Sequence, residues 1–223
     1  MLAQKICDFY FALPDTLALP ENVALIYPFD DSRTREAMCA FYTRYYSDDA
    51  PRTAIFGINP GRFGAGMTGV GFTDPVLLQE RYGIPNDLPK RTELSAQFVY
   101  EVVEAYGGPD RFYRDFYFTT VFPLGLLKEG KNYNYYDDKA TLTACEPLIA
   151  ESIAKQMAFG NLRRHIVSIG RGKNLKYLES FNKKYQLFDN ISVIPHPRWV
   201  MQYRRKQKAH YIREYIEVLQ QTL

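Results

Sequence analysis

The sequence has 223 residues, of which 46% are hydrophobic and 15% aromatic, with a formal net charge of +3. A chain of this size and composition buries one sizeable core, and nothing in it indicates a second domain. No stretch approaches the roughly 20 apolar residues of a membrane helix, and the amino terminus lacks the pattern of a signal peptide. We therefore expect a single-domain, soluble, cytoplasmic protein with no membrane partner.

Three cysteines, Cys7, Cys39 and Cys145, are odd in number and far apart in the sequence. This spacing indicates neither a disulfide framework nor a cysteine-bound metal or iron–sulfur cluster. We expect buried thiols, no metal and no cofactor.

Charge is distributed unevenly along the chain. Residues 1–150 carry 14 basic and 20 acidic residues, whereas residues 151–223 carry 14 and 5. Within that last third, residues 198–213 hold six basic residues, no acidic residue and several aromatic ones. Such a segment can follow a phosphate backbone, which favours a nucleic-acid partner; the alternative is a solvated helical face.

Helical and strand patterns alternate along the chain. Helices are expected at 32–47 with Ser32 as its cap, 92–108, 146–159 with Pro147 in its first turn, 171–185 and 206–221. Strands are expected at 52–58, 116–124, 165–170 and 191–197. This alternation predicts an α/β fold with a mostly parallel four-stranded sheet and helices on both faces.

Three unusual loops follow these strands, at 58–73, 123–136 and 195–204. Ligands of parallel sheets bind at the carboxyl ends of the strands, so the three loops are expected to converge on one site.

The first loop belongs to the stretch IFGINPGRFGAGMTGVGF, residues 55–72, in which Asn59 precedes Pro60 and five glycines follow. Glycines permit close approach of a ligand to backbone N–H groups, as in phosphate-binding loops, but the spacing fits neither a P-loop nor a dinucleotide fingerprint. An Asn side chain is not a base at neutral pH, yet its carbonyl oxygen can hold a water for attack. The alternative is a purely structural loop.

The third loop contains His196 between Pro195 and Pro197. The two prolines stiffen the backbone and leave the imidazole at a strand end, where it can donate a hydrogen bond to charge developing on a leaving group. A satisfied structural histidine is the alternative.

These residues resemble the active-site motifs of the single-strand-selective monofunctional uracil-DNA glycosylases, within the wider uracil-DNA glycosylase superfamily. That family has motifs of the types GMNPG, TGVPF and HPSPR. This sequence has GINPG at 57–61, TGVGF at 68–72 and HPR at 196–198, in the same order. The resemblance covers residues 52–215 in outline.

The resemblance implies a three-layer α/β/α sandwich and an enzyme that removes a base from DNA without a metal. We expect a monomer whose partner is single- or double-stranded DNA. A damaged nucleotide is flipped out of the stack into the pocket. By motif position, Asn59 would orient the attacking water and His196 would hydrogen-bond the departing base. Phe72 would stack on that base, and backbone groups of Ile58 and Gly61 would line the pocket.

Two departures from the family pattern bear on selectivity. Thr120 stands where the family has an Asn that reads the uracil edge, and a hydroxyl does not match the paired donor and acceptor of an amide. Asn132 and Asn134 are candidate replacement readers; the alternative is that they form a turn. Uracil is therefore the expected base, with xanthine and hypoxanthine as further candidates.

The second departure is HPRWVMQYRR in place of HPSPR, beginning at His196. The apolar residues that follow are candidates for a wedge that fills the gap left by the flipped base, and the arginines for phosphate contacts. These DNA-binding candidates are Arg198, Trp199, Val200, Met201, Arg204 and Arg205. For the apolar residues, the alternative is a plug under the last helix.

Two other classes of function stay open at this stage. One is a nucleic-acid-binding module without activity, which the presence of both Asn59 and His196 disfavours. The other is an α/β hydrolase acting on a small nucleotide or ester, but the chain has no GxSxG motif and no recognisable cysteine nucleophile.

Overall fold

The computed structural model describes residues 1–223. Its centre is an all-parallel sheet in the order β3-β2-β6-β7. The strands are β2 (Thr53–Gly57), β3 (Phe116–Thr120), β6 (His165–Ile169) and β7 (Asn190–Ile194). Every residue of β2 and β3 is buried, as expected for strands covered on both faces. The predicted α/β class and the four-stranded parallel sheet are confirmed.

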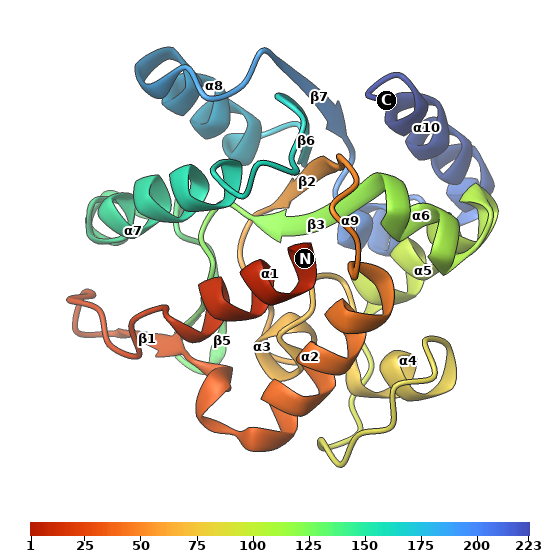
Figure 1. The fold of residues 1–223 in the computed structure, drawn as a ribbon. Helices are drawn as coiled ribbons and strands as arrows, with labels where there is room; N and C mark the ends of the chain where they lie inside the picture. The colour runs from red at the N-terminus through yellow and green to blue at the C-terminus, as the bar shows by residue number, and fades with distance from the viewer.

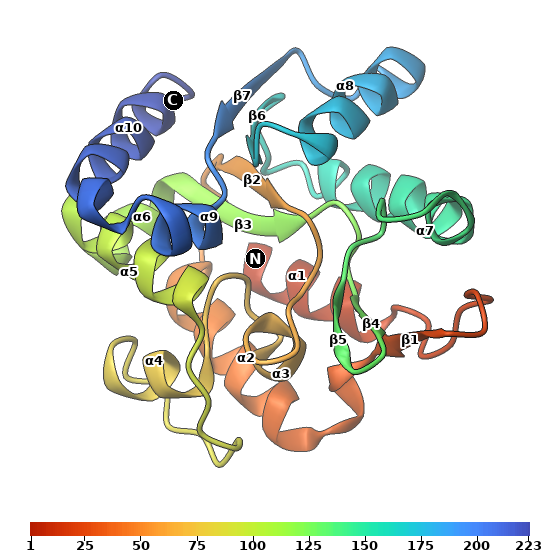
Figure 2. The ribbon, with the colours of Figure 1, turned by 180° about the vertical axis from the view of Figure 1, so that it is seen from behind.

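Helices cover both faces of this sheet and give three layers (Figures 1 and 2). On one face lie α7 (Lys139–Met157) and α8 (Lys173–Tyr185). On the other lie α5 (Leu94–Tyr106), α6 (Pro109–Asp115) and α10 (Lys208–Gln220), with the short helix α9 (Pro197–Tyr203) packed against α5. The α/β/α sandwich implied by the family resemblance is present.

The amino-terminal part contains the helix expected at 32–47 and adds one helix and one strand that the sequence pattern did not predict. Helices α1 (Leu2–Phe11) and α2 (Ser32–Tyr45) pack against each other, and β1 (Val23–Ile26) lies between them in the chain. The remaining short elements are η1 (Pro28–Asp30), α3 (Ala65–Thr68), α4 (Pro75–Glu80) and η2 (Arg205–Gln207).

The segment 123–136 is not an irregular loop, contrary to expectation. It contains β4 (Gly125–Lys128) and β5 (Lys131–Tyr133), which form an antiparallel hairpin, and β4 also pairs with β1. The hairpin turns at Glu129 and Gly130, whose φ angles of 51° and 70° suit a tight turn between twisted strands. The hairpin is stabilised by the pairing of β4 with β1, which lies about a hundred residues earlier in the chain. A local sequence pattern does not indicate such a distant partner.

Two helix starts also differ from the prediction. The cap of α2 is Asp31, whose carboxylate accepts a hydrogen bond from the Arg33 N–H at 2.9 Å, rather than Ser32. Helix α7 begins after Asp138, which accepts from the Thr141 N–H at 2.8 Å, so Pro147 lies inside the helix and not in its first turn. In both cases an Asp side chain satisfies an orphan N–H group.

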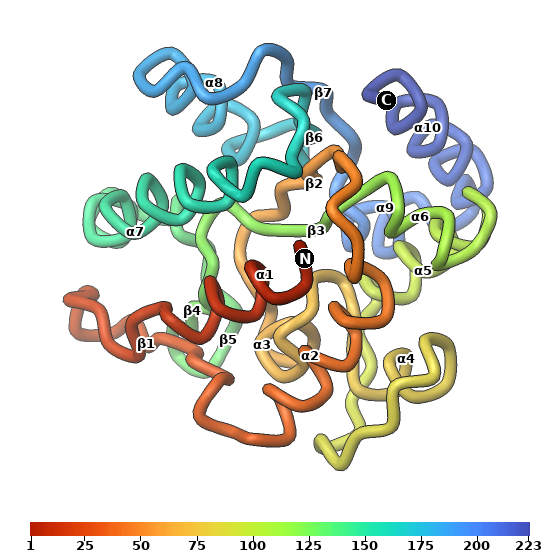
Figure 3. The backbone as a smooth tube through the Cα atoms, in the orientation of Figure 1, coloured from red at the N-terminus to blue at the C-terminus, as the bar shows by residue number.

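The parallel arrangement brings the carboxyl ends of the four strands to one edge of the sheet. From there the chain after β2 passes the β4–β5 hairpin and reaches α3 (Figure 3). At the same edge β7 runs into α9. None of the helices has the length and apolar character needed to cross a membrane.

At the opposite edge of the sheet a fully buried Arg52 precedes β2. Its guanidinium donates to the carbonyl oxygens of Tyr113 at 2.7 Å, Ala50 at 2.9 Å and Tyr45 at 3.3 Å. It also forms an ion pair of 2.7 Å with Asp48. This one side chain therefore ties the start of the central strand to the ends of α2 and α6.

Replacing Arg52 with Met is expected to lower the free energy of unfolding by about 3–5 kcal/mol, because the buried carbonyl groups of Tyr113 and Tyr45 and the partly buried one of Ala50 lose their donor. Urea denaturation followed by circular dichroism measures the change. Arg114→Met is the control: Arg114 is 63% exposed and its contact with Asp115 is 3.7 Å, so a loss of at most about 1 kcal/mol is expected. Equal losses in the two variants would contradict this account.

Candidate active site

The motif loop begins where β2 ends, at Gly57. A Cβ atom at this position would lie 3.2 Å from the Phe72 ring and 3.4 Å from the Thr120 methyl group, so the glycine lets the ring rest against the strand end. Phe72 has a φ of 55°, which is unusual for a bulky residue. Its ring contacts Phe118 with a centroid distance of 5.1 Å. The backbone and these contacts fix the orientation of Phe72.

The glycines of the loop serve internal packing. The Gly66 N–H donates to the Gly61 carbonyl at 2.9 Å, and a Cβ at Gly66 would lie 2.7 Å from that oxygen. The loop therefore folds back on itself, and this internal packing, rather than phosphate binding, explains the glycine at position 66.

Asn59 lies at the carboxyl end of β2 with its amide held from one side. Its Nδ2 donates to the Tyr133 carbonyl of β5 at 3.1 Å. Because a carbonyl can only accept, the amide nitrogen must face Tyr133 and the Oδ1 atom must face away from it. That Oδ1 atom is buried and has no hydrogen-bond partner in the protein. Since an unsatisfied buried acceptor is costly, this oxygen is available for a ligand or a water.

The β4–β5 hairpin holds the motif loop at two further points. The Arg62 N–H donates to Oδ1 of Asn132 at 3.0 Å, and the Arg62 guanidinium donates to the Gly130 carbonyl. The hairpin is part of a small antiparallel sheet in the order β1-β4-β5. This small antiparallel sheet therefore positions the Asn59 side chain and the loop that follows it.

His196 follows β7 and is the cap of α9. Its Nδ1 atom accepts a hydrogen bond from the Arg198 N–H at 3.2 Å. Burial, and to a smaller extent the charge of Arg198, lowers the pKa of the imidazole to about 4. The ring is therefore neutral at pH 7, and since Nδ1 is the acceptor, the proton resides on Nε2, which becomes a free donor. The Tyr215 hydroxyl anchors the preceding Pro195 carbonyl from α10.

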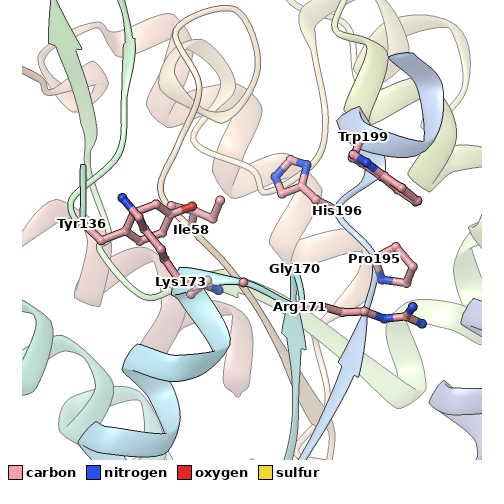
Figure 4. Close-up of a pocket in the computed structure, with 10 residues that line it drawn as sticks. Ile58, Tyr136, Gly170, Arg171, Lys173, Pro195, His196 and Trp199 are labelled. Carbon is pink, nitrogen blue, oxygen red and sulfur yellow. The ribbon is translucent and has the colours of Figure 1, made fainter. Parts of the chain in front are cut away.

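Two adjoining cavities open at this edge of the sheet. The smaller, of about 320 Å³, brings Asn59 and His196 together although they are far apart in the sequence. It is lined by Ile58, Asn59, Pro60, Gly61, Asn132, Asn134, His196, Arg198, Trp199, Gln202 and Tyr203. The larger, of about 450 Å³, shares Ile58, His196 and Trp199 with it. Its other lining residues are Tyr136, Gly170, Arg171, Gly172, Lys173, Asn174 and Pro195 (Figure 4).

The base-binding candidates are divided between these cavities and their surroundings. Ile58 and Gly61 line the smaller cavity, whereas Phe72 and Thr120 line neither of the two. The Thr120 hydroxyl donates to the Phe122 carbonyl at 2.7 Å. Asn134 lines the smaller cavity, but its Nδ2 is bound to the Asp137 carboxylate at 3.1 Å.

Most DNA-binding candidates lie on α9 or directly after it. Arg198 is exposed, and the Trp199 side chain is 38% exposed with the Arg204 guanidinium 5.0 Å from its ring centroid. Arg205 is also exposed. Met201 requires a correction: it is only 8% exposed, because it lies on the inner face of α9, and it is not available as a wedge in this structure.

Val200 is fully buried on the same inner face and is not a surface wedge either. The apolar plug considered as an alternative describes Val200 and Met201.

Several residues of the two cavities were not singled out from the sequence. They are Tyr136, Arg171, Lys173, Asn174, Gln202 and Tyr203. The GRGK segment at 170–173 follows β6 at the same edge of the sheet, so the rule that ligands bind at strand ends points to it as well. Tyr136 and Tyr203 carry no such signal, because tyrosines are frequent throughout this chain. No group of three or more His, Cys, Asp or Glu side chains is placed to hold a metal ion.

Comparison with known proteins agrees with this site. The model of the uracil-DNA glycosylase superfamily matches residues 43–220. The chain belongs to the uracil-DNA glycosylase superfamily, which confirms the resemblance seen in the motifs, and its class is that of a DNA glycosylase-type hydrolase.

Among solved structures, the chain is similar to the crystal structure of wild-type SMUG2 from Pedobacter heparinus. The TM-score is 0.93 at 39% sequence identity, and the match covers 98% of this chain and 96% of that chain. No curated protein matches the sequence.

Proposed function

We propose that this protein is a monomeric, monofunctional DNA glycosylase that hydrolyses the N-glycosidic bond of uracil in DNA. Deaminated purines such as xanthine or hypoxanthine are further candidate bases, and the product is an abasic site that enters base excision repair. One observation carries the proposal: a buried, unpartnered Asn59 oxygen lines the same cavity as a neutral His196 with a free Nε2–H.

In this proposal Asn59 holds the attacking water. Its Oδ1 atom accepts a hydrogen bond from the water, while the bond from Nδ2 to Tyr133 prevents the amide from turning. An amide is too weak a base to deprotonate water, so its contribution is to place the water near the C1′ atom of the sugar. This suits a dissociative reaction, in which the sugar becomes strongly electrophilic before the water adds.

His196 stabilises the leaving base. As the C1′–N bond breaks, its electron pair moves onto the base, and negative charge collects on the carbonyl oxygens. The Nε2–H of a neutral imidazole donates to one of these oxygens without being consumed in the reaction. The water oxygen then bonds to C1′, and the proton that it releases balances the one that the base anion takes up.

In this proposal Phe72 stacks on the base, with backbone groups of Ile58 and Gly61 along its edge. Because Phe72 lines neither cavity in this structure, the contact requires the motif loop to open toward its ring when the base enters. The fixed orientation of the Phe72 ring supports stacking, because a preorganised ring loses little freedom when the base arrives. Thr120 retains only acceptor capacity toward a ligand, since its proton is given to Phe122.

Basic side chains around the cavities would follow the DNA backbone. Arg198, Arg204 and Arg205 lie on or after α9. Arg171 lies two residues before α8, and Lys173 is the first residue of α8. Trp199, with Arg204 over its ring, supplies an exposed aromatic surface at the rim. A nucleotide that leaves the stack would reach His196 between these two groups of cations.

The test is base release from end-labelled oligonucleotides that carry one uracil, xanthine or hypoxanthine, single- and double-stranded. We expect release of at least one base, strands that break only after alkali, and binding that weakens steeply as salt is raised. Strand cleavage without alkali would contradict the monofunctional assignment. Salt-sensitive binding without release of any base would favour an inactive nucleic-acid-binding module instead.

A further inference from the structure

If the protein removes bases from DNA as proposed above, the group that reads the base edge is still to be assigned. Thr120 donates its proton to Phe122, and the Asn134 amide is bound to Asp137. None of the three predicted readers, Thr120, Asn132 and Asn134, lines the larger cavity. The polar side chains that line this cavity beside His196 are therefore further candidates for the reading group.

Tyr136 is such a side chain. It lines the larger cavity together with His196, and its hydroxyl makes no hydrogen bond within the protein. Figure 4 shows its ring extending into the cavity toward Ile58, from the wall opposite His196 and Trp199. A base that receives a hydrogen bond from His196 on one side would thus face the Tyr136 hydroxyl on the other.

The backbone that carries Tyr136 is held firmly. The neighbouring Tyr135 is fully buried, and its hydroxyl donates to Oδ1 of Asn174 at 2.9 Å. The turn itself is closed by a bond of 3.0 Å from the Asp137 N–H to the Asn134 carbonyl and by one of 2.9 Å from the Asn134 N–H to the Asp137 carboxylate. The side chain therefore starts from a fixed position.

The Tyr136 ring is also held from two sides. It makes an edge contact with Tyr135 at a centroid distance of 4.9 Å, and the Lys173 ammonium lies 5.7 Å from its centroid. A group fixed in this way can select among ligands with little entropic cost. Burial, with a smaller contribution from Asp137, raises the pKa of Tyr136 to about 12. At neutral pH the hydroxyl is therefore protonated and can both donate and accept.

We propose that the Tyr136 hydroxyl hydrogen-bonds the edge of the flipped base and sets the base preference of the enzyme. A single hydroxyl can satisfy a carbonyl oxygen or a ring N–H, but it cannot match both at once as an amide does. The consequence is a broader choice of bases than a paired amide reader would allow.

The test compares Tyr136→Phe with the parent enzyme, since this change removes one oxygen atom and keeps the ring. The ratio of kcat/KM for uracil to kcat/KM for xanthine or hypoxanthine is expected to change by about 10-fold, the scale of one hydrogen bond. Inhibition by free uracil, which has neither sugar nor phosphate, is expected to weaken to a similar degree. Tyr185→Phe, which changes an exposed tyrosine at the end of α8 outside both cavities, is the control and should change neither quantity.

The outcomes separate this inference from the proposed function. An active parent together with an unchanged base ratio and unchanged inhibition by uracil in Tyr136→Phe would contradict the role of Tyr136 alone. Equal losses on all bases with inhibition by uracil unchanged would place the hydroxyl on the sugar or phosphate and also overturn base reading. Absence of base release by the parent would contradict both proposals.

Discussion

Replacing Asn59 with Ala is expected to slow base release by about 10²-fold or more, the cost of losing one contact made in the transition state. The substitution removes the buried, unpartnered side-chain oxygen that is proposed to hold the water, and it leaves the basic residues around the cavities in place. DNA affinity is therefore expected to stay within about threefold of the parent value, a difference below 1 kcal/mol. Single-turnover kinetics and fluorescence anisotropy measure the two quantities separately.

The matched control is Asn190→Ala, which removes an exposed amide at the start of β7, at the opposite edge of the sheet. Its rate should equal that of the parent. If Asn59→Ala retained a rate within a few-fold of the parent, the water would have to be held by another group, and the mechanism proposed for Asn59 would be wrong.

Replacing His196 with Ala is expected to reduce base release by about 10²- to 10³-fold, because the anionic base then departs without a donor. In the parent the pKa of His196, lowered to about 4, leaves the imidazole mostly neutral from pH 5 to pH 9. The rate should therefore show no inflection near the usual histidine pKa of 6.5. A pH–rate profile of the parent from pH 5 to pH 9 tests this point.

The same lowered pKa affects stability. As the pH falls from 6.5 toward about 4, the unfolded chain binds a proton at His196 before the folded chain does, so the folded state loses stability over this interval. His196→Gln should lose less stability over this pH interval than the parent.

For the kinetic prediction, His165→Gln, at the opposite end of the sheet, serves as the control and should keep the parent rate. An inflection near pH 6.5 that disappears in His196→Ala would contradict a neutral donor.

The central sheet could be predicted from the sequence because its strands are short apolar runs bounded by turn residues. The ends of β2 and β7 could also be predicted, because Pro60 and Pro197 interrupt the strand pattern. The candidate catalytic residues Asn59 and His196 directly precede these two prolines. The parallel topology then places both residues at one edge of the sheet, where they line one cavity.

Other parts depended on contacts that no local pattern reveals. The hairpin of β4 and β5 is stabilised by β1, so its three-residue and four-residue strands looked like a polar loop. Met201 was expected at the surface because it follows Trp199, but a helical turn places the two on different faces of α9. Tyr136 could not be predicted as a site residue, because the local sequence indicates neither its position in the cavity nor its lack of a hydrogen-bond partner.

The small antiparallel sheet also has a bearing on how such enzymes diverge. Strand β1 lies outside residues 43–220, the part that the superfamily model matches, yet it pairs with β4, which pairs with β5, whose Tyr133 carbonyl fixes the Asn59 amide. Substitutions in the first 42 residues can therefore tilt that amide while every letter of the shared motifs is preserved. Two members of the family with identical motifs can therefore differ in turnover rate. Part of what determines the rate lies in residues 1–42, which the family model does not match.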